Sequence, residues 1–492
     1  MEKRFFLAFF ITLVFFLVYS HFMSKYFPQQ PAPQKVAQNI SGKQEQILSP
    51  KSEILEDSLE NDAAGENLPQ EKIGNFIVTF SPLGGYIKEI SIQTKENRLP
   101  FRNIGFLLQD KNKNFTPLIR GNRLIFQGPN SEKKEFIFEG YNLQIKFASP
   151  PTSPLIVFSN ELTSKGWNMD QRYQEIFYFY EGGLKRSAPR KTKEKAYEDV
   201  KFAGGRGRYY CVSLAEGSYD VEWVKEKDKG YLYLMKVPSV VSLYIGPQTE
   251  KSMKPFGLQG VIYYGFFHII GTGMVKLLYF LHSLTKNWGL SIILFSSLIY
   301  LVLFPFTAKS TKAMKRMQEF QPEIEALKEK YKDNPQKMQK ETLALYREHK
   351  INPLGGCLPL LFQFPVFIAL YQVLFRLVDL KNATFLWIKD LASPDRFLQL
   401  PFTVPLLGTN YLNILPLCIA ILGIVQQKVI AVPSSSAQAS QQKTMGLFMS
   451  VFIGFIFYKF PSALVLYWFT QNILTIAYQM RIRKVPSPSP AS

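Results

Sequence analysis

Cysteine and histidine are scarce in this chain of 492 residues, and their scarcity excludes several classes of protein. The three cysteines, Cys211, Cys357 and Cys418, lie far apart, and the four histidines show no metal-ligand spacing. Three scattered cysteines do not form a disulfide framework, and without a Cys-x-x-Cys pair there is no redox or zinc signature. We therefore expect no metal site and no cofactor.

Acidic residues are the second deficit. The chain has 58 Lys and Arg against 38 Asp and Glu, a net charge of +20, and no carboxylate falls within a long apolar run. It also lacks an HExxH motif, a Walker A motif and a Ser/His pair within those runs. These absences argue against intramembrane proteolysis, carboxylate-coupled transport and an ATP-driven step. We expect no catalytic residues and no enzyme activity.

Apolar residues, in contrast, are abundant, at 47% of the chain with 42 Phe. A helix needs about 20 apolar residues to cross a bilayer. Six segments meet this need, and they are predicted to span the membrane: 1–23, 288–307, 354–377, 402–425, 445–460 and 463–480. The first is predicted to be an uncleaved signal anchor, with a cleaved signal peptide as the alternative.

The distribution of basic residues predicts the orientation of these spans. Residues 309–350 contain 11 Lys/Arg and 7 Asp/Glu, and Arg481, Arg483 and Lys484 follow the last span. Basic loops remain in the cytoplasm, so both regions, including a tail at 482–492, are predicted to be cytoplasmic. This bias also explains the net charge without nucleic-acid binding. An even number of spans then places residues 24–287 outside.

Residues 255–286 are apolar enough to resemble a further span. Such a span would place the basic residues 309–350 outside the cytoplasm, against the orientation predicted above. Their polar side chains recur at helical spacing, at Tyr264, His268, Thr272, Lys276, Tyr279 and Ser283. This pattern predicts a helix that lies in the membrane interface. A buried helix of the outer domain is the alternative.

The outer part of the chain has two contrasting compositions. Residues 24–71 are rich in Pro, Gln, Ser and Glu, which predicts a disordered linker. Residues 72–250 contain short alternating runs such as FIVTF and KEFIFEG, which are typical of an antiparallel β-sandwich. Within them, the glycines of residues 204–207 predict a turn and not a phosphate loop.

The basic segment 309–350 predicts two antiparallel helices. Apolar residues recur at helical spacing on both sides of the turn at 332–335. The segment is longer than a simple connection requires, which favours a docking or gating surface over a solvated loop. Its candidate docking residues are Lys315, Arg316, Lys328 and Lys332.

Uncharged polar residues interrupt the predicted spans. The candidates for a polar groove are Ser296, Tyr300, Gln363, Gln427, Asn472 and Thr475. Helices that face only lipid have no reason to carry amides, so these residues should face one another or water. Hydrogen bonds that only join the helices are the alternative.

Several motifs closely resemble the YidC/Oxa/Alb membrane-protein insertase family. They are NWGLSII at 287–293, ALYREHKINPLGGCLPLLFQFPVFIALY at 344–371 and FPSALVLYWFTQNILTI at 460–476. The resemblance implies a polytopic α-helical membrane protein with six transmembrane helices, a five-helix insertase core at 287–481 and an all-β periplasmic sandwich domain, as in the Gram-negative type. It implies residence in the bacterial inner membrane with both termini cytoplasmic.

The resemblance also implies a function and a site. Similar proteins insert and fold nascent membrane proteins, alone or with the Sec translocon, through a hydrophilic groove open to cytoplasm and lipid; the ribosome, targeting factors and membrane lipids are further partners. Ser296, Gln363 and Asn472 match polar groove positions, and Trp468 matches an aromatic that meets the substrate. Bacterial members usually carry an Arg where this chain has Tyr300, so we expect a neutral hydroxyl there. A transporter and a purely structural assembly factor are the rival functions.

Overall fold

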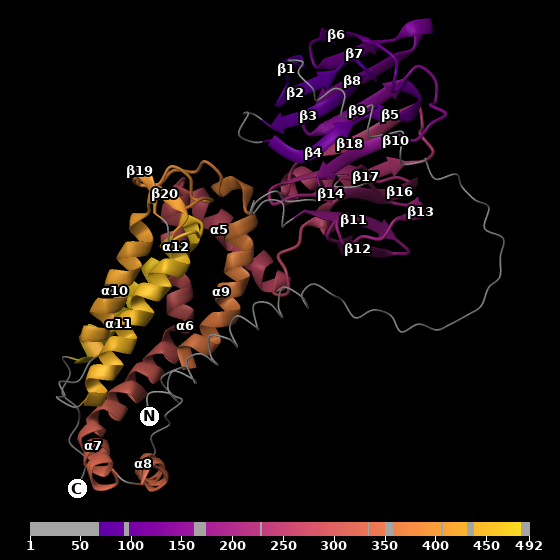
Figure 1. The fold of residues 1–492 in the computed structure, drawn as a ribbon. Helices are drawn as coiled ribbons and strands as arrows, with labels where there is room; N and C mark the ends of the chain where they lie inside the picture. Colours follow the sequence, from indigo (N-terminus) through magenta and orange to yellow (C-terminus); the bar gives the residue numbers. More distant parts are fainter. Residues whose placement is uncertain are drawn as a thin grey trace, which may run out of the picture. The chain divides into compact units, whose positions relative to one another are not determined.

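The computed structural model describes residues 68–92, 98–161, 174–226, 229–332, 334–349, 358–404, 407–430 and 437–483. The chain divides into two compact units, one of Pro31–Tyr263 and one of Met1–Gln30 with Tyr264–Ser492. The first is built mainly of strands and the second mainly of helices (Figure 1). The predicted first span and nearly all of the predicted linker lie outside the described residues.

Two antiparallel sheets form the β unit. The first has the order β1 (Gln70–Ile73), β2 (Phe76–Ser81), β3 (Tyr86–Ile92), β4 (Arg98–Ile104), β10 (Leu155–Glu161), β17 (Lys229–Leu234), β16 (Tyr219–Glu226) and β13 (Lys195–Val200), with β5 (Phe106–Leu107) also pairing with β10. The second has the order β12 (Gly183–Ser187), β11 (Glu175–Tyr180), β14 (Phe202–Arg206), β15 (Tyr210–Leu214), β18 (Val240–Pro247), β9 (Asn142–Phe147), β8 (Lys133–Glu139), β7 (Arg123–Gln127) and β6 (Thr116–Arg120). The predicted antiparallel β-sandwich is therefore confirmed.

Aromatic side chains fill the interior between these sheets. The period-two pattern buries every second residue of β2, and Tyr86 and Phe106 meet edge to face with ring centroids 5.0 Å apart. Edge-to-face contacts add to the free energy that these large side chains gain by leaving water. The abundance of Phe in the sequence thus serves the sandwich as well as the helices.

The predicted turn at residues 204–207 is wrong, because Gly204 and Gly205 lie within strand β14. A Cβ atom on Gly204 would lie 2.3 Å from the carbonyl oxygen of Val212, and one on Gly205 would lie 2.6 Å from the ring of Phe158. These glycines are therefore needed for close packing and not for a turn.

The helical unit contains α5 (His268–Thr285), α6 (Trp288–Glu319), α7 (Gln321–Lys330), α8 (Pro335–Glu348), α9 (Leu358–Arg376), α10 (Ile414–Ile430), α11 (Ala437–Phe457) and α12 (Ser462–Arg483). Helix α12 packs against α6, α9 and α10, and α10 also packs against α11. The strands β19 (Leu398–Val404) and β20 (Thr409–Leu412) lie at one end of this unit, and α7 and α8 lie at the other (Figure 1). Helix α12 is thus the central helix of the bundle.

Helix α6 is longer than the span predicted at 288–307. Its 32 residues continue past Pro305 to Glu319, so the helix forms the first arm of the basic segment as well. At 1.5 Å per residue it is about 48 Å long, which exceeds a bilayer core of about 30 Å. Among the described residues, Trp288–Met317 alone is long and apolar enough to cross a membrane, and Ile414–Val429 and Thr444–Phe457 are shorter apolar helices.

The predicted start of the fourth span at residue 402 is also wrong. Leu398–Val404 and Thr409–Leu412 are the paired strands β19 and β20, and helix α10 begins only at Ile414. Pro401 cannot donate a helical hydrogen bond, and Gly408 adopts a φ of +58° that suits a turn. Apolar composition alone did not reveal this change from strand to helix.

Helix α5 packs with the helical unit, against α6 and α9, so the alternative of a helix buried in the outer domain is wrong. Its buried side includes Met274, Leu278 and Leu281. Its other side exposes apolar residues too, among them Ile269 with 88% of its surface accessible. The helix therefore presents a second apolar face that the bundle does not cover.

Candidate functional site

A polar contact joins α6 and α12 inside the bundle. The Gln471 Nε2 atom donates a hydrogen bond of 2.8 Å to the backbone carbonyl of Ser296. The Ser296 side chain is fully buried, and its hydroxyl donates to the Ile292 carbonyl one turn earlier at 2.6 Å. Such a bond lets a hydroxyl residue lie in an apolar helix without an unsatisfied donor.

Tyr300, one turn further along α6, makes the second contact of this interface. Its hydroxyl donates to the backbone carbonyl of Leu474 at 3.2 Å, and Thr475 approaches the same hydroxyl. Only 7% of Tyr300 is exposed. We call Ser296, Tyr300, Gln471 and Thr475 the polar seam. At Tyr300 the seam thus has a neutral hydroxyl bonded to the neighbouring helix.

Gln363 and Trp468 lie where α12 meets other helices. The Gln363 amide on α9 donates to the hydroxyl of Tyr467, a buried residue of α12. The next residue, Trp468, packs against Phe367 of α9 and Phe457 of α11, with centroid distances of 5.3 and 5.4 Å. These two candidates thus connect α12 to α9 and α11 and do not belong to the polar seam.

The remaining groove candidates are more dispersed. Gln427 on α10 donates from Nε2 to the Ser450 hydroxyl on α11 at 3.0 Å, so it joins a different pair of helices. Asn472 is half-buried on α12. The structure therefore brings Ser296, Tyr300 and Thr475 together, and it places Gln427 elsewhere.

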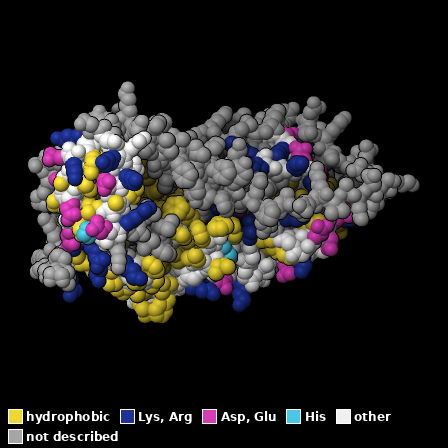
Figure 2. Space-filling model, turned by 90° about the horizontal axis from the view of Figure 1, so that it is seen from below, with side chains coloured by type: hydrophobic (Ala, Val, Ile, Leu, Met, Phe, Trp, Pro, Cys, Tyr) yellow, Lys and Arg dark blue, Asp and Glu magenta, His cyan; other side chains and the backbone are white. Residues whose placement is uncertain are grey.

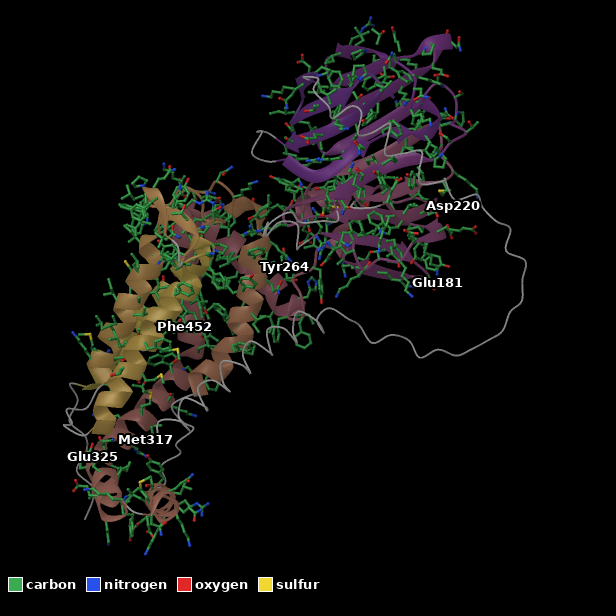
Figure 3. The ribbon with its side chains drawn as sticks, in the orientation of Figure 1. Glu181, Asp220, Tyr264, Met317, Glu325 and Phe452 are labelled. Carbon is green, nitrogen blue, oxygen red and sulfur yellow. The ribbon has the colours of Figure 1, made fainter. Side chains whose placement is uncertain are left out.

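The basic docking candidates lie at the α7–α8 end. Lys315 is half-buried and Arg316 is exposed near the end of α6, beside Met317, which Figure 3 labels. Lys332 is exposed after α7, and the side chain of Lys328 lies outside the described residues. Figure 2, which views the molecule from this end, shows charged side chains next to a broad field of hydrophobic ones.

A network at the β19–β20 end closes the bundle, and sequence reasoning missed it. The buried Asp395 carboxylate accepts a hydrogen bond of 2.7 Å from the amide of Leu415 at the start of α10. Burial raises the pKa of Asp395, and the Leu415 amide opposes that shift. Asn413 donates its side-chain amide to the Tyr458 carbonyl at 2.8 Å. An Asn just before an apolar helix is a capping signal that could have identified Asn413, whereas Asp395 precedes the β19–β20 hairpin and gives no such signal.

The side chains of the seam can bind polar groups but cannot exchange protons near neutral pH. It consists of hydroxyls and an amide, and the described residues contain no group of three or more His, Cys, Asp or Glu that could hold a metal ion. Hydroxyls and amides can replace water around a peptide group that enters an apolar region. The arrangement therefore suits transient polar contacts.

Comparisons with known proteins match the helical part of the chain. Residues 280–488 match the family model described as 60Kd inner membrane protein. The membrane protein insertase YidC of Polynucleobacter asymbioticus is 40% identical over 252 residues, which cover 51% of this chain and 42% of that protein. The YidC of Syntrophobacter fumaroxidans is 37% identical over 305 residues, which cover 59% and 53%.

A solved structure titled "Active YidC insertase crystal structure with the first transmembrane domain resolved" is 22% identical, covers 87% of this chain and 97% of that chain, and has a TM-score of 0.43. The alignments to the two curated relatives span about half of each relative's length. The resemblance seen in the sequence is therefore confirmed for residues 280–488, which are similar to the 60Kd inner membrane protein family and to the membrane protein insertases YidC.

Proposed function

We propose that this chain inserts integral membrane proteins and helps them to fold and assemble, alone or with the Sec translocon, and that it makes and breaks no covalent bond. The polar seam carries this proposal. Gln471, Ser296 and Tyr300 bring an amide and two hydroxyls into the interface between α6 and α12, which are otherwise largely apolar.

The physical task is to move a polar segment across hydrocarbon. Each unsatisfied polar group costs several kcal/mol there. Hydroxyls and amides partway across remove part of this cost, while the client's apolar helix contributes roughly 0.3 to 0.6 kcal/mol per Leu, Ile, Phe or Val. Because the Tyr300 hydroxyl is bonded to Leu474, we infer that a client segment must displace this bond when it enters the seam.

The proposed topology has six spans, cytoplasmic termini and an external β-sandwich, in a bacterial inner membrane. The basic segment 309–350 would then receive clients at the cytoplasmic side, and α5 would lie in the external membrane interface. The exposed apolar face of α5, with Ile269 and Leu284, supports the second placement. Nascent membrane proteins would be the clients, and the Sec translocon, the ribosome and targeting factors would be partners.

Photo-crosslinking tests the location of the client path. Crosslinkers at Ser296, Tyr300 and Trp468 should capture a nascent single-span protein during insertion. Val240, an exposed residue of the β unit, serves as a control for nonspecific capture. Failure at all three positions, with the protein folded and active, would refute the proposed path.

Reconstituted insertion tests the activity itself. We expect proteoliposomes that contain only this chain to insert a short single-span client. A transporter would instead produce solute flux without insertion. A purely structural assembly factor would retain its effect after the seam residues are made apolar.

A further inference from the structure

The connection between α9 and α10 exposes an unusual number of large apolar side chains. Leu386 is 74% exposed and Phe402 is 61% exposed, and Trp387, Phe397 and Leu398 are exposed as well. Leu386 and Trp387 form the tip of a tight turn, and the other three lie on or beside the β19–β20 hairpin. We call these five residues the apolar tip. Clustered exposed apolar residues of this size mark a surface that contacts something other than water.

The backbone at the tip is strained, because a leucine occupies a position with a positive φ. Phe385 and Ile388 exchange two backbone hydrogen bonds of 2.9 Å, and between them Leu386 has a φ of +52°. Gly, Asn or Asp normally occupies such a position, because a larger side chain meets its own backbone there. A leucine at this position therefore strains the backbone. Its exposed side chain is also unfavourable in water, a cost that is removed when the side chain enters an apolar medium.

The turn is also held rigidly. The ring of Phe385 lies against Gly289 so closely that a Cβ on this glycine would come within 2.1 Å of it. The Asp390 carboxylate accepts hydrogen bonds of 3.0 Å from the amides of Asn382 and Ala392, and one of 2.5 Å from the hydroxyl of Ser393. The loop therefore presents Leu386 in a defined position.

The same contacts place the tip relative to the spanning helix. Gly289 is the second residue of α6, so the turn lies at the end of the apolar helix Trp288–Met317. Helix α10 begins directly after the β19–β20 hairpin. If α6 crosses the bilayer, the apolar tip lies at the level where the bilayer meets water.

Charge at the tip favours a lipid surface. Lys389 and Arg396 are exposed beside the apolar residues, and the Arg396 guanidinium lies 5.3 Å from the centre of the Tyr411 ring. The nearby carboxylates of Asp390 and Asp395 instead face backbone amides. Trp with Arg or Lys beside exposed apolar side chains is the composition that anchors proteins at the headgroup level.

We propose that the apolar tip inserts into the outer leaflet of the bilayer, and that Lys389 and Arg396 contact anionic phospholipid headgroups. This anchor holds the loop whose Asp395 and Asn413 close the end of the helical bundle. The inference rests on the proposed crossing of the membrane by α6 and is independent of any insertase activity.

Fluorescent labels at single introduced cysteines test the proposal in the full chain, with Cys357 and Cys418 replaced by Ser and the buried Cys211 retained. The probes are vesicles of phosphatidylcholine with or without phosphatidylglycerol. Leu386→Cys and Phe402→Cys labels should be quenched several-fold more strongly by shallow lipid nitroxides than by aqueous iodide. Lys332→Cys, exposed after α7, gives the aqueous reference, and Leu301→Cys, exposed on α6, gives the reference for the bilayer interior.

The possible outcomes distinguish lipid, water and protein as the surroundings of the apolar tip. Iodide quenching at residues 386 and 402 equal to that at residue 332 would refute insertion. Protection from iodide without quenching by lipid nitroxides would indicate coverage by protein and would also refute it. Phosphatidylglycerol should increase the quenching of these labels by lipid nitroxides. In the variant with Lys389→Gln and Arg396→Gln this increase should disappear, while the labels remain quenched by lipid nitroxides. Because no client is present, loss of insertase activity would leave these results unchanged.

Discussion

The side-chain amide of Gln471 donates a 2.8 Å hydrogen bond to the backbone carbonyl of Ser296, and this bond joins the two helices that form the polar seam. In an α-helix the carbonyl oxygen of Ser296 already accepts a backbone hydrogen bond. The Gln471 amide therefore donates to the second lone pair of this oxygen. A bond of this kind is weak enough to be exchanged for another polar partner.

Gln471→Leu should therefore impair insertion more than stability. Interhelical hydrogen bonds in membranes contribute about 0.6 kcal/mol on average, so thermal unfolding in detergent should change little. We expect the rate of client insertion into proteoliposomes to fall several-fold, because a polar partner is lost. Ile473→Leu, on the exposed side of α12, is the matched control. Unchanged insertion by a folded Gln471→Leu protein would contradict a role for the seam.

Tyr300→Phe should discriminate between clients. The variant keeps the ring contact with Phe304 but removes the hydroxyl that reaches Leu474. Insertion of a client with a polar translocated segment should slow, whereas a client with a minimal translocated segment should insert at the normal rate. The ratio of the two rates is the measurement. An equal slowing of both clients would indicate that the hydroxyl acts only on the structure of the bundle.

The contact between Gln363 and Tyr467 should appear as a coupling energy. Gln363→Leu, Tyr467→Phe and the double variant form a cycle in which the two losses of unfolding free energy are not additive. We expect a coupling of about 0.6 kcal/mol, and at most about 1.7 kcal/mol, as for other hydrogen bonds between membrane helices. Steric trapping or thermal unfolding of the full chain provides the free energies. Strict additivity would show that the bond does not form.

Lys134 should give the β unit a distinctive pH dependence. Its Nζ atom lies 2.6 Å from Asp110 Oδ2, and burial lowers the pKa of Lys134 to about 8, against the opposing effect of Asp110. The unfolded chain keeps this proton up to about pH 10.4. Between these values the unfolded state binds more protons, so the contribution of Lys134 to the free energy of unfolding rises with pH, by at most about 1.4 kcal/mol per unit.

Pulse proteolysis of the full chain in urea at pH 7.5 to 9.5 measures this effect. The difference between the wild type and Lys134→Met isolates the lysine, because other titrating groups are common to both proteins. The wild type should gain stability with pH relative to the variant. A difference that stays constant with pH would contradict the lowered pKa of Lys134.

Gly204→Ala should destabilise the β unit. The added Cβ would meet the Val212 carbonyl at 2.3 Å, at a point where β14 pairs with β15, so the strands must separate. Overpacking of this kind typically costs about 1 to 3 kcal/mol. Gly183→Ala is the control, because its nearest atom would lie at 3.9 Å. The same proteolysis assay measures both, and equal stabilities would show that the sheet adapts to the added methyl group.

Much of the fold follows from local pattern. Alternating residues predicted the β-sandwich, because a sheet with one buried face repeats every second residue. The apolar runs predicted at 288–307 and 463–480 located the beginnings of α6 and α12 closely, but α6 continues to Glu319 and α11 begins at Ala437, before the predicted 445. The start of α10 is not predicted correctly, because apolar composition does not distinguish a hairpin such as β19–β20 from a helix. The glycines of β14 wrongly predict a turn, because the side chains and backbone that they pack against come from segments distant in the sequence.

The candidate site could be predicted only in part, because the contacts between its residues are not visible in the sequence. Polar residues within apolar runs are conspicuous in a sequence, and Ser296, Tyr300 and Thr475 were found in this way. Their partners, the backbone carbonyls of Ile292 and Leu474, could not be assigned, because backbone groups carry no sequence signal. The pairing of the Gln471 side chain with the Ser296 carbonyl depends on how α6 and α12 pack.

The sequence by itself determined the β-sandwich, the apolar helices and the family resemblance of residues 280–488, because local periodicity and contiguous motifs express them. The tertiary structure alone decided which polar residues meet. It paired Gln471 with Ser296, assigned Gln427 to the α10–α11 interface and placed Phe385 on Gly289. These contacts depend on how helices rotate about their axes and pack, and packing is a property of the whole bundle.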